Sequence, residues 1–349
     1  MAATANRETM QAIVWPSYGS PDVLQLQDVP KPEPTDDQVL VRVAAASLNR
    51  ADLDYLRGWP LFGRLFTGLR RPRTGRLGLD VAGRVEAAGP KATRFRPGDE
   101  VYGNMTVYGF GAFAEYVCAR EKAFAPKPAA MTMETAATIP EAAVVAIQGL
   151  RLRGGRTPKP GDRVLVNGAS GSVGPWAVQI AKSLGTEVTG VSRPEKMEFV
   201  RSIGADHVVD YTGERFPPRT HRYDWILDIA GKDSMRDWRK ALSPNGVYVV
   251  VGGTVPRMLQ ALVMGPLISR SAQQTMAIMT WWKPFEREDV AALEKLVAEG
   301  KIAPVIDRRY PLREVPDALR YVDSGHAKGK VVITMHEPMS LPPAPGLHW

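Results

Sequence analysis

A short apolar run that ends in a glycine-rich turn constrains the fold of this chain more than any other feature. Residues 163–174 read Arg-Val-Leu-Val-Asn-Gly-Ala-Ser-Gly-Ser-Val-Gly, and residues 175–184 continue as a helical pattern. A buried strand, a glycine turn and a helix in this order are typical of dinucleotide-binding units, where the helix N-terminus faces a pyrophosphate. We therefore predict a phosphate-binding turn made of Ala169, Ser170, Gly171, Ser172, Val173 and Gly174.

The residues of this turn have separate expected roles. Ala169 occupies the first position of the usual G-x-G-x-x-G, so the pattern here is A-x-G-x-x-G. We expect Gly171 to let main-chain N–H groups approach the phosphates, and Gly174 to let the helix pack closely on the strand.

The tip of the next expected strand, residues 187–191, indicates which coenzyme is preferred. An NAD-binding unit places an Asp or Glu there, about 20 residues after the turn, to contact the ribose 2′-hydroxyl. This strand instead ends in Ser192 and Arg193, with Lys196 one turn on. A hydroxyl and two cations suit a 2′-phosphate, so NADPH is favoured over NADH. The alternative is that Arg193 and Lys196 are solvated at the start of a surface helix.

The pattern of apolar runs divides the chain into two regions. The first third has short β-rich runs between Gly and Pro breaks, which predicts a compact antiparallel β domain. From residue 142 onward strands alternate with helices, which predicts an α/β fold with a doubly wound parallel sheet. The chain then returns to a β style, so the expected domains are 1–141 with 300–349, and 142–299. The expected parallel strands are 164–167, 187–191, 207–210, 225–229, 247–251 and 275–281.

Composition excludes several other classes of protein. The chain has 44% hydrophobic and 23% charged residues, which is ordinary for a globular protein. Its single cysteine, Cys118, excludes an internal disulfide framework and fits a reducing compartment, and we interpret it as buried filler rather than a nucleophile. The N-terminus lacks an apolar signal core and no stretch of 18 apolar residues exists, so we expect a cytoplasmic protein without integral membrane insertion.

The net charge of +8 is a sum over the whole chain and does not by itself indicate a nucleic-acid partner. No run of five like charges appears, and we expect no binding to nucleic acid. The densest basic stretch, residues 64–76, interleaves Leu65, Phe66 and Leu69. This stretch is either a solvated loop beside the active site or a cationic, partly apolar patch.

Several motifs outside the glycine turn resemble those of one enzyme superfamily. They are Gly19–Leu24, Asn49-x-x-Asp52, Gly78–Val85, Phe95–Gly103, Gly204–Tyr211, Gly300–Ile306 and Gly325–Val331. In this order, and with the glycine turn, they make the chain similar to the medium-chain dehydrogenase/reductase superfamily, in its zinc-independent quinone oxidoreductase branch. The resemblance covers roughly residues 10–336 and implies a Rossmann nucleotide-binding domain inserted in a chaperonin-10-like (GroES-like) catalytic domain.

The resemblance identifies the positions at which a zinc enzyme of the superfamily would carry its metal ligands. Zinc enzymes of the superfamily keep a Cys and a His where this chain has Asn49 and Leu79, and the four-cysteine lobe is absent. We therefore expect no metal, and activation of the substrate by hydrogen bonds alone, which suits quinones and conjugated ketones. Four further candidates are too scattered along the sequence to form a ligand cluster, namely His207, His221, His326 and His336.

The resemblance also suggests which side chains contact the substrate. Asn49 is expected near the reacting ring as a donor to a carbonyl, although the same residue could simply satisfy backbone groups in a turn. Tyr55 is our first choice for a donor to the substrate, with water as its competitor. We expect Asp52 to have a structural role with Arg57.

Two further groups are expected at the coenzyme. Tyr211 is expected at the adenosine 2′-phosphate, with an exposed strand-end aromatic as the alternative. Val251, Gly252 and Gly253 are expected beside the nicotinamide half, although a plain turn would use the same glycines.

These residues support an NADPH-dependent reductase that transfers a hydride to a quinone or an α,β-unsaturated carbonyl. One alternative is a catalytically weak NADPH-binding interaction or sensor protein, because Val145 stands where the family commonly has Thr and because residues 64–76 form a basic, partly apolar loop. Another is an enoyl reductase specific to one pathway. Glu141 replaces a usually apolar residue and, with Val145, argues against activity on ordinary quinones. Superfamily members commonly pair through the sixth strand, so residues 275–281 predict a homodimer.

Overall fold

The computed structural model describes residues 8–213, 222–231, 234–253, 255–271 and 273–335, and the chain divides into two compact units. Unit 1 comprises Met1–Ala137, Arg308–Ser324 and Val331–Trp349. Unit 2 comprises Thr138–Asp307 and Gly325–Lys330. The domain limits expected from the sequence, 1–141 with 300–349 and 142–299, stay a prediction.

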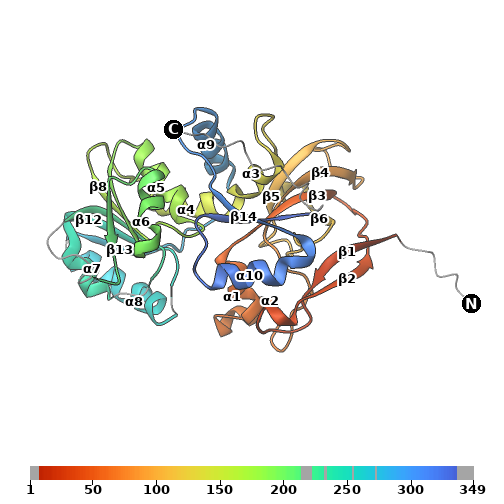
Figure 1. The fold of residues 1–349 in the computed structure, drawn as a ribbon, viewed down its shortest axis with the longest axis horizontal. Helices are drawn as coiled ribbons and strands as arrows, with labels where there is room; N and C mark the ends of the chain where they lie inside the picture. Colours follow the sequence, from red (N-terminus) through yellow and green to blue (C-terminus); the bar gives the residue numbers. More distant parts are fainter. Residues whose placement is uncertain (1–7, 214–221, 232–233, 254, 272, 336–349) are drawn as a thin grey trace, which may run out of the picture. The chain divides into compact units, whose positions relative to one another are not determined.

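Unit 1 is built mainly on β-strands, most of them drawn in red to yellow in Figure 1, with the late strands β14 and β15 in blue. One sheet has the order β14-β15-β3-β4-β5-β7, with β6 also paired to β3, and β1 and β2 form a separate antiparallel pair. The pairings among β3, β4, β5, β6, β7 and β15 are antiparallel, as the sequence predicts. The strands are β1 (Thr9–Val14), β2 (Gln25–Pro30), β3 (Gln38–Leu48), β4 (Asp80–Ala88), β5 (Glu100–Asn104), β6 (Tyr116–Arg120), β7 (Phe124–Pro126), β14 (Ile306–Pro311) and β15 (Lys330–Thr334).

The helices of unit 1 are short, and α1 begins at a polar cap. Asn49 and Asp52 form a capping box at the start of α1, and Gly58 ends that helix in the left-handed conformation with φ 63°. The α-helices are α1 (Arg50–Arg57), α2 (Arg64–Thr67), α3 (Met133–Ala137) and α10 (Val315–Asp323). The 3₁₀ turns are η1 (Pro21–Val23), η2 (Leu61–Gly63), η3 (Glu121–Ala123) and η6 (Leu312–Glu314).

Unit 2 contains a six-stranded sheet in the order β10-β9-β8-β11-β12-β13, and all of its pairings are parallel. This is the doubly wound order, and the strand order reverses between β8 and β11, where such folds bind ligands at the carboxyl ends of the strands. The prediction of a parallel α/β fold is confirmed. The strands are β8 (Arg163–Asn167), β9 (Glu187–Ser192), β10 (His207–Asp210), β11 (Tyr223–Asp228), β12 (Leu242–Val250) and β13 (Thr275–Ile278).

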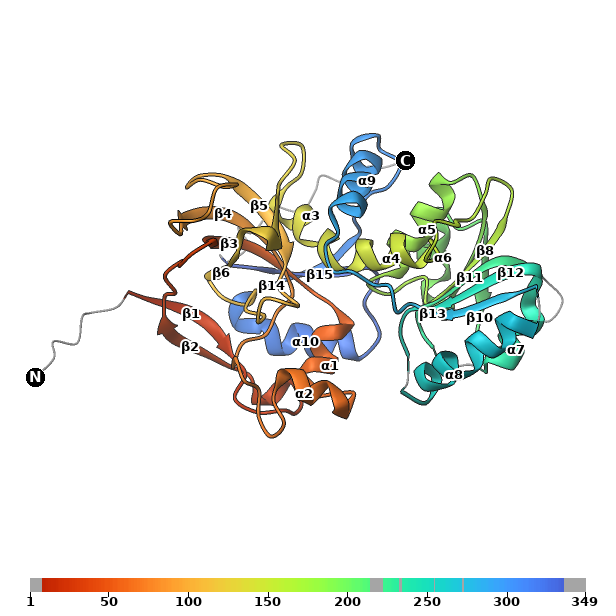
Figure 2. The same ribbon diagram turned by 180° about the vertical axis from the view of Figure 1, so that it is seen from behind.

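Helices connect and cover these strands, and α7 and α8 lie beside β12 and β13 (Figure 2). The helices are η4, a π-helix (Ile139–Ala143), α4 (Val144–Gly149), α5 (Gly174–Ser183), η5 (Pro194–Lys196), α6 (Met197–Ser202), α7 (Met235–Ala241), α8 (Val255–Ser271) and α9 (Arg287–Ala298). In the described part of the chain, no helix is long and apolar enough to span a bilayer.

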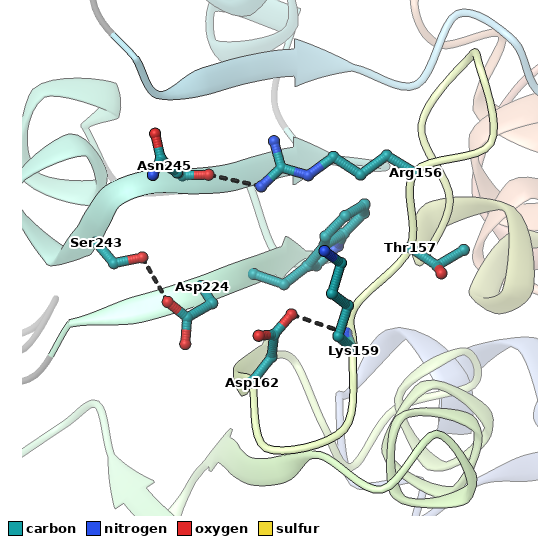
Figure 3. A pocket seen from close by; sticks show the side chains of 8 residues that line it. Arg156, Thr157, Lys159, Asp162, Asp224, Ser243 and Asn245 are labelled. Carbon is teal, nitrogen blue, oxygen red and sulfur yellow. Dashed lines mark hydrogen bonds between the residues drawn. The ribbon is translucent and has the colours of Figure 1, made fainter.

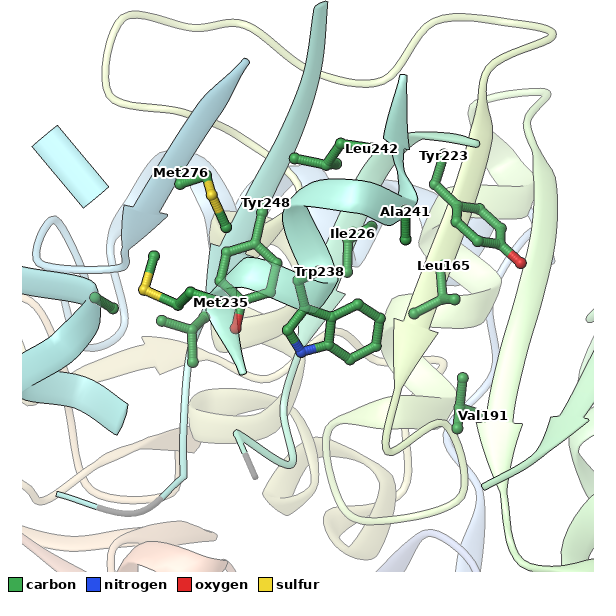
Figure 4. Close-up of a cluster of buried hydrophobic side chains, with 12 residues drawn as sticks. Leu165, Val191, Tyr223, Ile226, Met235, Trp238, Ala241, Leu242, Tyr248 and Met276 are labelled. Carbon is green, nitrogen blue, oxygen red and sulfur yellow. The ribbon is translucent and has the colours of Figure 1, made fainter. Parts of the chain in front are cut away.

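An aromatic pair anchors α7 on the sheet. The rings of Trp238 and Tyr248 lie 6.0 Å apart between their centroids, and both side chains are almost completely buried. Figure 4 shows Met235 and Met276 beside this pair. Burying large side chains from a helix and two strands in one cluster fixes α7 against the face of the sheet.

Cys118 lies in β6 and is only partly buried. The expectation that it is a buried packing residue was therefore wrong about the extent of its burial. Its Sγ lies 3.7 Å from Oε1 of Gln38, and burial raises the pKa of the Cys118 thiol to about 11. Arg76 opposes this rise without cancelling it. The thiol is therefore protonated at neutral pH.

This raised pKa predicts slow alkylation of Cys118. At pH 8 the native protein should react with iodoacetamide at least about a hundredfold more slowly than a free thiol, because only the thiolate is nucleophilic. The rate should rise as the pH increases toward 11. Mass spectrometry of timed samples measures it, with the urea-unfolded chain as control, and equal rates in folded and unfolded chains would contradict the assignment.

Candidate functional site

The glycine turn lies at the carboxyl ends of β8 and β9. The main-chain N–H of Ala169 donates to the carbonyl of Val191 at 3.0 Å, and that of Gly171 donates to Gly168 at 3.3 Å. Gly168 has φ +90°, a conformation that L side chains rarely adopt. These contacts hold residues 168–173 at the edge where the strand order reverses.

The two glycines singled out in the sequence meet different surroundings. A Cβ atom at Gly174 would lie 2.3 Å from the carbonyl oxygen of Gly168 and 2.4 Å from the carbonyl of Ala169, so only glycine lets α5 start this close to the turn. A Cβ at Gly171 would have Gly168 O, at 3.8 Å, as its nearest neighbour. The space beside Gly171 is open to an approaching group.

Ser172 supplies a second reason to assign an anion to this turn. Its Oγ is buried, and it has no hydrogen-bond partner among the residues that the structure describes. A buried hydroxyl without a partner is costly, and the first N–H groups of α5 also have no partner within the helix. A dinucleotide pyrophosphate would satisfy both sets of donors, so the turn fits such a group.

Arg193 and Tyr211, which the sequence places 18 residues apart, come together at the tips of β9 and β10. The Arg193 Nε donates to the Tyr211 hydroxyl at 3.0 Å, and both side chains remain exposed. Ser192 pairs with Asp210 in the register of these strands, and its Oγ donates to the carbonyl of Arg193 at 3.2 Å. A guanidinium, a phenol and a hydroxyl therefore gather at one sheet corner.

Lys196 differs from the solvated cation that the sequence left as an alternative. Its side chain is buried, and its Nζ donates to the carbonyls of Gly325 at 2.6 Å and Ala327 at 2.7 Å. Burial lowers the pKa of Lys196, and the nearby Arg193 lowers it further. Lys196 thus fastens the 325–327 segment to the tip of β9.

A buried carboxylate at the same edge was not singled out in the sequence. Asp228, the last residue of β11, accepts hydrogen bonds from Nδ2 of Asn167 at 2.7 Å and from the hydroxyl of Tyr248 at 2.7 Å. The main-chain N–H of Gly231 donates to it at 2.8 Å. Burial raises the pKa of Asp228, and these donors oppose the rise. The signal in the sequence was a polar residue closing each of two apolar strands, at Asn167 and Asp228.

Gly252 and Gly253, predicted at the coenzyme, also have a structural reason to be glycine. A Cβ at Gly231 would lie 2.1 Å from the carbonyl oxygen of Gly252, and one at Gly253 would lie 2.6 Å from Cα of Gly231. The turns after β11 and β12 therefore touch main chain to main chain. Val251 donates its N–H to the carbonyl of Asp228 at 3.0 Å, which ties the same two strand ends together.

Asn49, in unit 1, belongs to a buried polar network centred on Asp80. The Asp80 carboxylate accepts from Nδ2 of Asn49 at 2.8 Å, Nδ2 of Asn104 at 3.0 Å and Oγ of Ser47 at 3.2 Å. The Asn49 N–H donates to Asp52 at 2.8 Å, as part of the capping box. The amide of Asn49 is therefore held in one orientation.

Tyr55 lies farther along α1 and packs on Phe110, with ring centroids 4.9 Å apart. Asp52 has the structural role expected of it, as part of the capping box of α1, but Arg57 does not share that role. Arg57 instead forms a two-pronged ion pair with Asp323, with nitrogen-to-oxygen distances of 3.0 and 2.6 Å. Asp52 faces the start of its own helix because its short side chain caps the Asn49 N–H.

The described residues contain no group of three or more His, Cys, Asp or Glu side chains that could hold a metal ion. Leu79, at one expected ligand position, is fully buried and has no donor atom. His207 pairs with Glu187, with Nε2 2.6 Å from Oε1, while His221 and His336 lie outside the described residues.

A hollow of about 330 Å³ lies at the opposite edge of the unit 2 sheet, at the amino ends of β8, β11 and β12 (Figure 3). Its polar groups are satisfied by one another: Arg156 donates to the carbonyl of Asn245 at 2.7 Å, and Ser243 donates to Asp224 at 2.6 Å. It contains none of the residues predicted to bind coenzyme or substrate. We therefore place the candidate site at the carboxyl edge, which holds the Ser172 Oγ that has no partner among the described residues.

Comparison with known proteins identifies the family to which this chain is similar. The family described as alcohol dehydrogenase GroES-like domain matches residues 35–129, and the family described as zinc-binding dehydrogenase matches residues 203–333. The NADPH-dependent alkenal/one oxidoreductase, chloroplastic, of Arabidopsis thaliana is 31% identical over 93% of this chain and 79% of that protein. The chloroplast envelope quinone oxidoreductase homolog of the same organism is 33% identical over 93% of this chain and 98% of that protein.

A solved structure agrees with these sequence matches. The quinone oxidoreductase from Coxiella burnetii superposes with a TM-score of 0.83 at 29% sequence identity, covering 94% of this chain and all of that chain. The fold of both units is thus the one that the sequence motifs suggested.

Alanine substitutions at the two glycines of the turn should affect different properties, one the stability of the fold and the other dinucleotide binding. Gly174→Ala should lower the free energy of unfolding by about 1–3 kcal/mol, because its Cβ has no room beside Gly168. Gly171→Ala should leave stability almost unchanged but weaken dinucleotide binding, because its Cβ enters the open space. Thermal unfolding and titration calorimetry with NADPH measure the two effects. A Gly171→Ala protein that binds NADPH like the parent chain would show that no phosphate lies there.

Proposed function

The chain belongs to the medium-chain dehydrogenase/reductase superfamily, in its quinone oxidoreductase-like branch, and we propose that it is an NADPH-dependent, metal-independent reductase of quinones or α,β-unsaturated carbonyls. It is an oxidoreductase, and its relatives use a nicotinamide coenzyme. The observation that carries the proposal is the carboxyl edge of the unit 2 sheet. There an open glycine turn, a buried hydroxyl and a cationic strand tip lie along one sheet edge.

In this proposal each part of the edge holds one part of NADPH. The turn 169–174 and Ser172 bind the pyrophosphate, while Arg193, Tyr211 and Ser192 bind the 2′-phosphate through charge-assisted hydrogen bonds. The main chain of 251–253 lines the nicotinamide half. Bound NADPH would supply the hydride.

The substrate carbonyl needs a donor as negative charge develops on its oxygen. We assign that role to Asn49 or Tyr55, with water as the remaining alternative. Asp80 favours Asn49 because it fixes the orientation of the amide before a substrate arrives. Neither residue would need a metal, since the acceptor is already polarised along its conjugated system.

We also propose the cytoplasm as the compartment, because a lone thiol fits a reducing environment. The Arabidopsis relatives carry chloroplast names, so this part of the proposal depends on the cysteine alone.

Coenzyme kinetics test the function. The protein should oxidise NADPH in the presence of at least one quinone or enone, followed by the loss of near-ultraviolet absorbance. Arg193→Ala should raise the KM for NADPH by about 10- to 100-fold, since a charge-assisted contact to the 2′-phosphate is removed, and should leave that for NADH unchanged. Equal effects on both coenzymes, or no turnover with any acceptor, would contradict the proposal.

Lys196→Met provides the matched control. Because Lys196 binds the carbonyls of Gly325 and Ala327, its removal should lower thermal stability, whereas Arg193→Ala should not. A loss of stability in Arg193→Ala would mean that its kinetic effect is structural.

The homodimer expected from the sequence remains part of the proposal. β13 is an edge strand of the unit 2 sheet, and its pairing ends sooner than the expected 275–281. On the neighbouring α8, Leu259, Leu262 and Val263 are exposed, with relative exposures of 54%, 51% and 62%, at the i, i+3 and i+4 spacing of one helix face. A second copy of the chain would bury this face.

Light scattering tests this pairing. The parent chain should have twice the mass of one chain at micromolar concentration, and Leu262→Asp should shift it to a monomer, because a charge at the centre of an apolar interface is costly to desolvate. Leu26→Asp, at an exposed position of β2, serves as control and should stay dimeric. A monomeric parent chain would rule out the interface.

A further inference from the structure

Residues 59–76, here called the arginine loop, expose large apolar side chains that the reductase function does not use. Within residues 59–69 the exposed side chains are Trp59 at 47%, Leu61 at 61%, Leu65 at 60%, Phe66 at 81% and Leu69 at 64% of their full area. Single exposed apolar residues are normal on a protein surface, but five within eleven residues form a cluster that indicates an interaction site.

The arginine loop is also strongly cationic. Residues 55–79 contain six arginines and no Asp or Glu. Arg70, Arg71, Arg73 and Arg76 are all exposed, and no ion pair with a described residue involves them. The positive charge beside the apolar cluster is therefore not neutralised within the described part of the chain.

The loop has a defined conformation that presents these side chains. The Tyr18 hydroxyl donates to the carbonyl of Gly68 at 2.6 Å, and the Arg64 guanidinium lies 4.4 Å from the centre of the Tyr18 ring. The N–H of Arg73 donates to the carbonyl of Thr67 at 2.7 Å, and Gly68 has φ +127° with no room for a Cβ beside Arg71. These contacts bend the chain back on itself. Leu65, Phe66 and Leu69 thus flank the bend while Arg70 and Arg71 follow it.

We propose that the arginine loop docks this protein on the surface of an anionic lipid bilayer. Interfacial binding needs Trp, Phe and Leu side chains to enter the boundary between headgroups and acyl chains, and cations to contact the anionic headgroups. The loop supplies both within one short segment of fixed shape. It is too short to span a bilayer, so the attachment is peripheral and reversible.

Charge complementarity selects a bilayer as the occupant. The acid-free composition gives attraction to a negatively charged surface, and exposed aliphatic and aromatic groups suit an acyl interior that accepts them without matched shape. An acidic protein segment would satisfy the arginines but would leave Phe66 and its neighbours in need of a fitted apolar surface. The proposal does not depend on the coenzyme site in unit 2.

Co-sedimentation with vesicles tests the proposal. The full chain should bind vesicles made of equal parts phosphatidylcholine and phosphatidylglycerol, and should not bind phosphatidylcholine alone. Binding should weaken steeply as NaCl is raised, because the headgroup attraction is screened. Arg70→Gln with Arg71→Gln should weaken binding about 30-fold, since each cation near an anionic surface contributes about fivefold. Leu65→Ser with Phe66→Ser should also weaken vesicle binding, although this double substitution leaves the net charge unchanged.

Matched controls separate the loop from the charge of the whole chain. Arg153→Gln with Arg201→Gln removes the same net charge from exposed positions in unit 2, and should leave vesicle binding close to that of the parent chain. Leu26→Ser is the control for the apolar change. Thermal unfolding of each variant shows whether the fold is kept.

Three outcomes would overturn the proposal. One is equal binding to neutral and anionic vesicles, and another is an equal loss in the loop and control arginine variants. The third is binding to polyglutamate without binding to either vesicle, which would assign the loop to an acidic polypeptide. NADPH oxidation in solution should be the same in the loop variants and the parent, so failure of the reductase proposal would be seen separately.

Discussion

The contact between the start of α5 and the glycine turn is the constraint on which the rest of unit 2 depends. No atom beyond hydrogen fits between Gly174 and the carbonyl of Gly168, so the helix begins directly against the end of the central strand β8. This closeness aims the unsatisfied N–H groups of the first helical turn at the sheet edge. It also leaves the Oγ of Ser172 buried, with no hydrogen-bond partner among the described residues. The proposed anion site would thus be a consequence of packing, since the same contact that joins helix to strand also brings the donors together.

The hydrogen bonds of the buried Asp228 carboxylate hold the neighbouring strand ends in place beside that contact. Asp228 links β11 to β8 through Asn167 and to β12 through Tyr248, although burial raises its pKa. A buried carboxylate is tolerated only while its donors remain, because an unpaired buried charge is far more costly than an unpaired neutral group. The arrangement therefore resists any shift of one strand end against the others. The glycine contacts between the turns after β11 and β12 act in the same direction.

Sequence reasoning succeeded where the signal is local and failed where it depends on distant segments. The strand, turn and helix around residues 163–184 were predictable because apolar periodicity and glycine spacing lie in one continuous stretch. The carbonyls that bind Lys196 come from a segment about 130 residues later, and Asp80, the partner of Asn49, comes from another strand. Arg57 likewise pairs with Asp323, which lies 266 residues away in the sequence. Side-chain pairing across the sheet or between helices is set by tertiary packing, which spacing along the chain does not encode.

The two cations at the tip of β9 illustrate how burial decides which charge is available to a ligand. Both looked equivalent in the sequence, yet Lys196 is desolvated, has a lowered pKa and donates to two carbonyls. The Arg193 side chain is instead exposed and donates to Tyr211 at the sheet corner. A guanidinium keeps its charge in either setting and can offer two parallel donors to a phosphate. An ammonium held by carbonyls would have to break those bonds first. In the proposed function, selectivity for a 2′-phosphate would therefore fall to Arg193 and Tyr211, while Lys196 would act through the shape of the segment it holds.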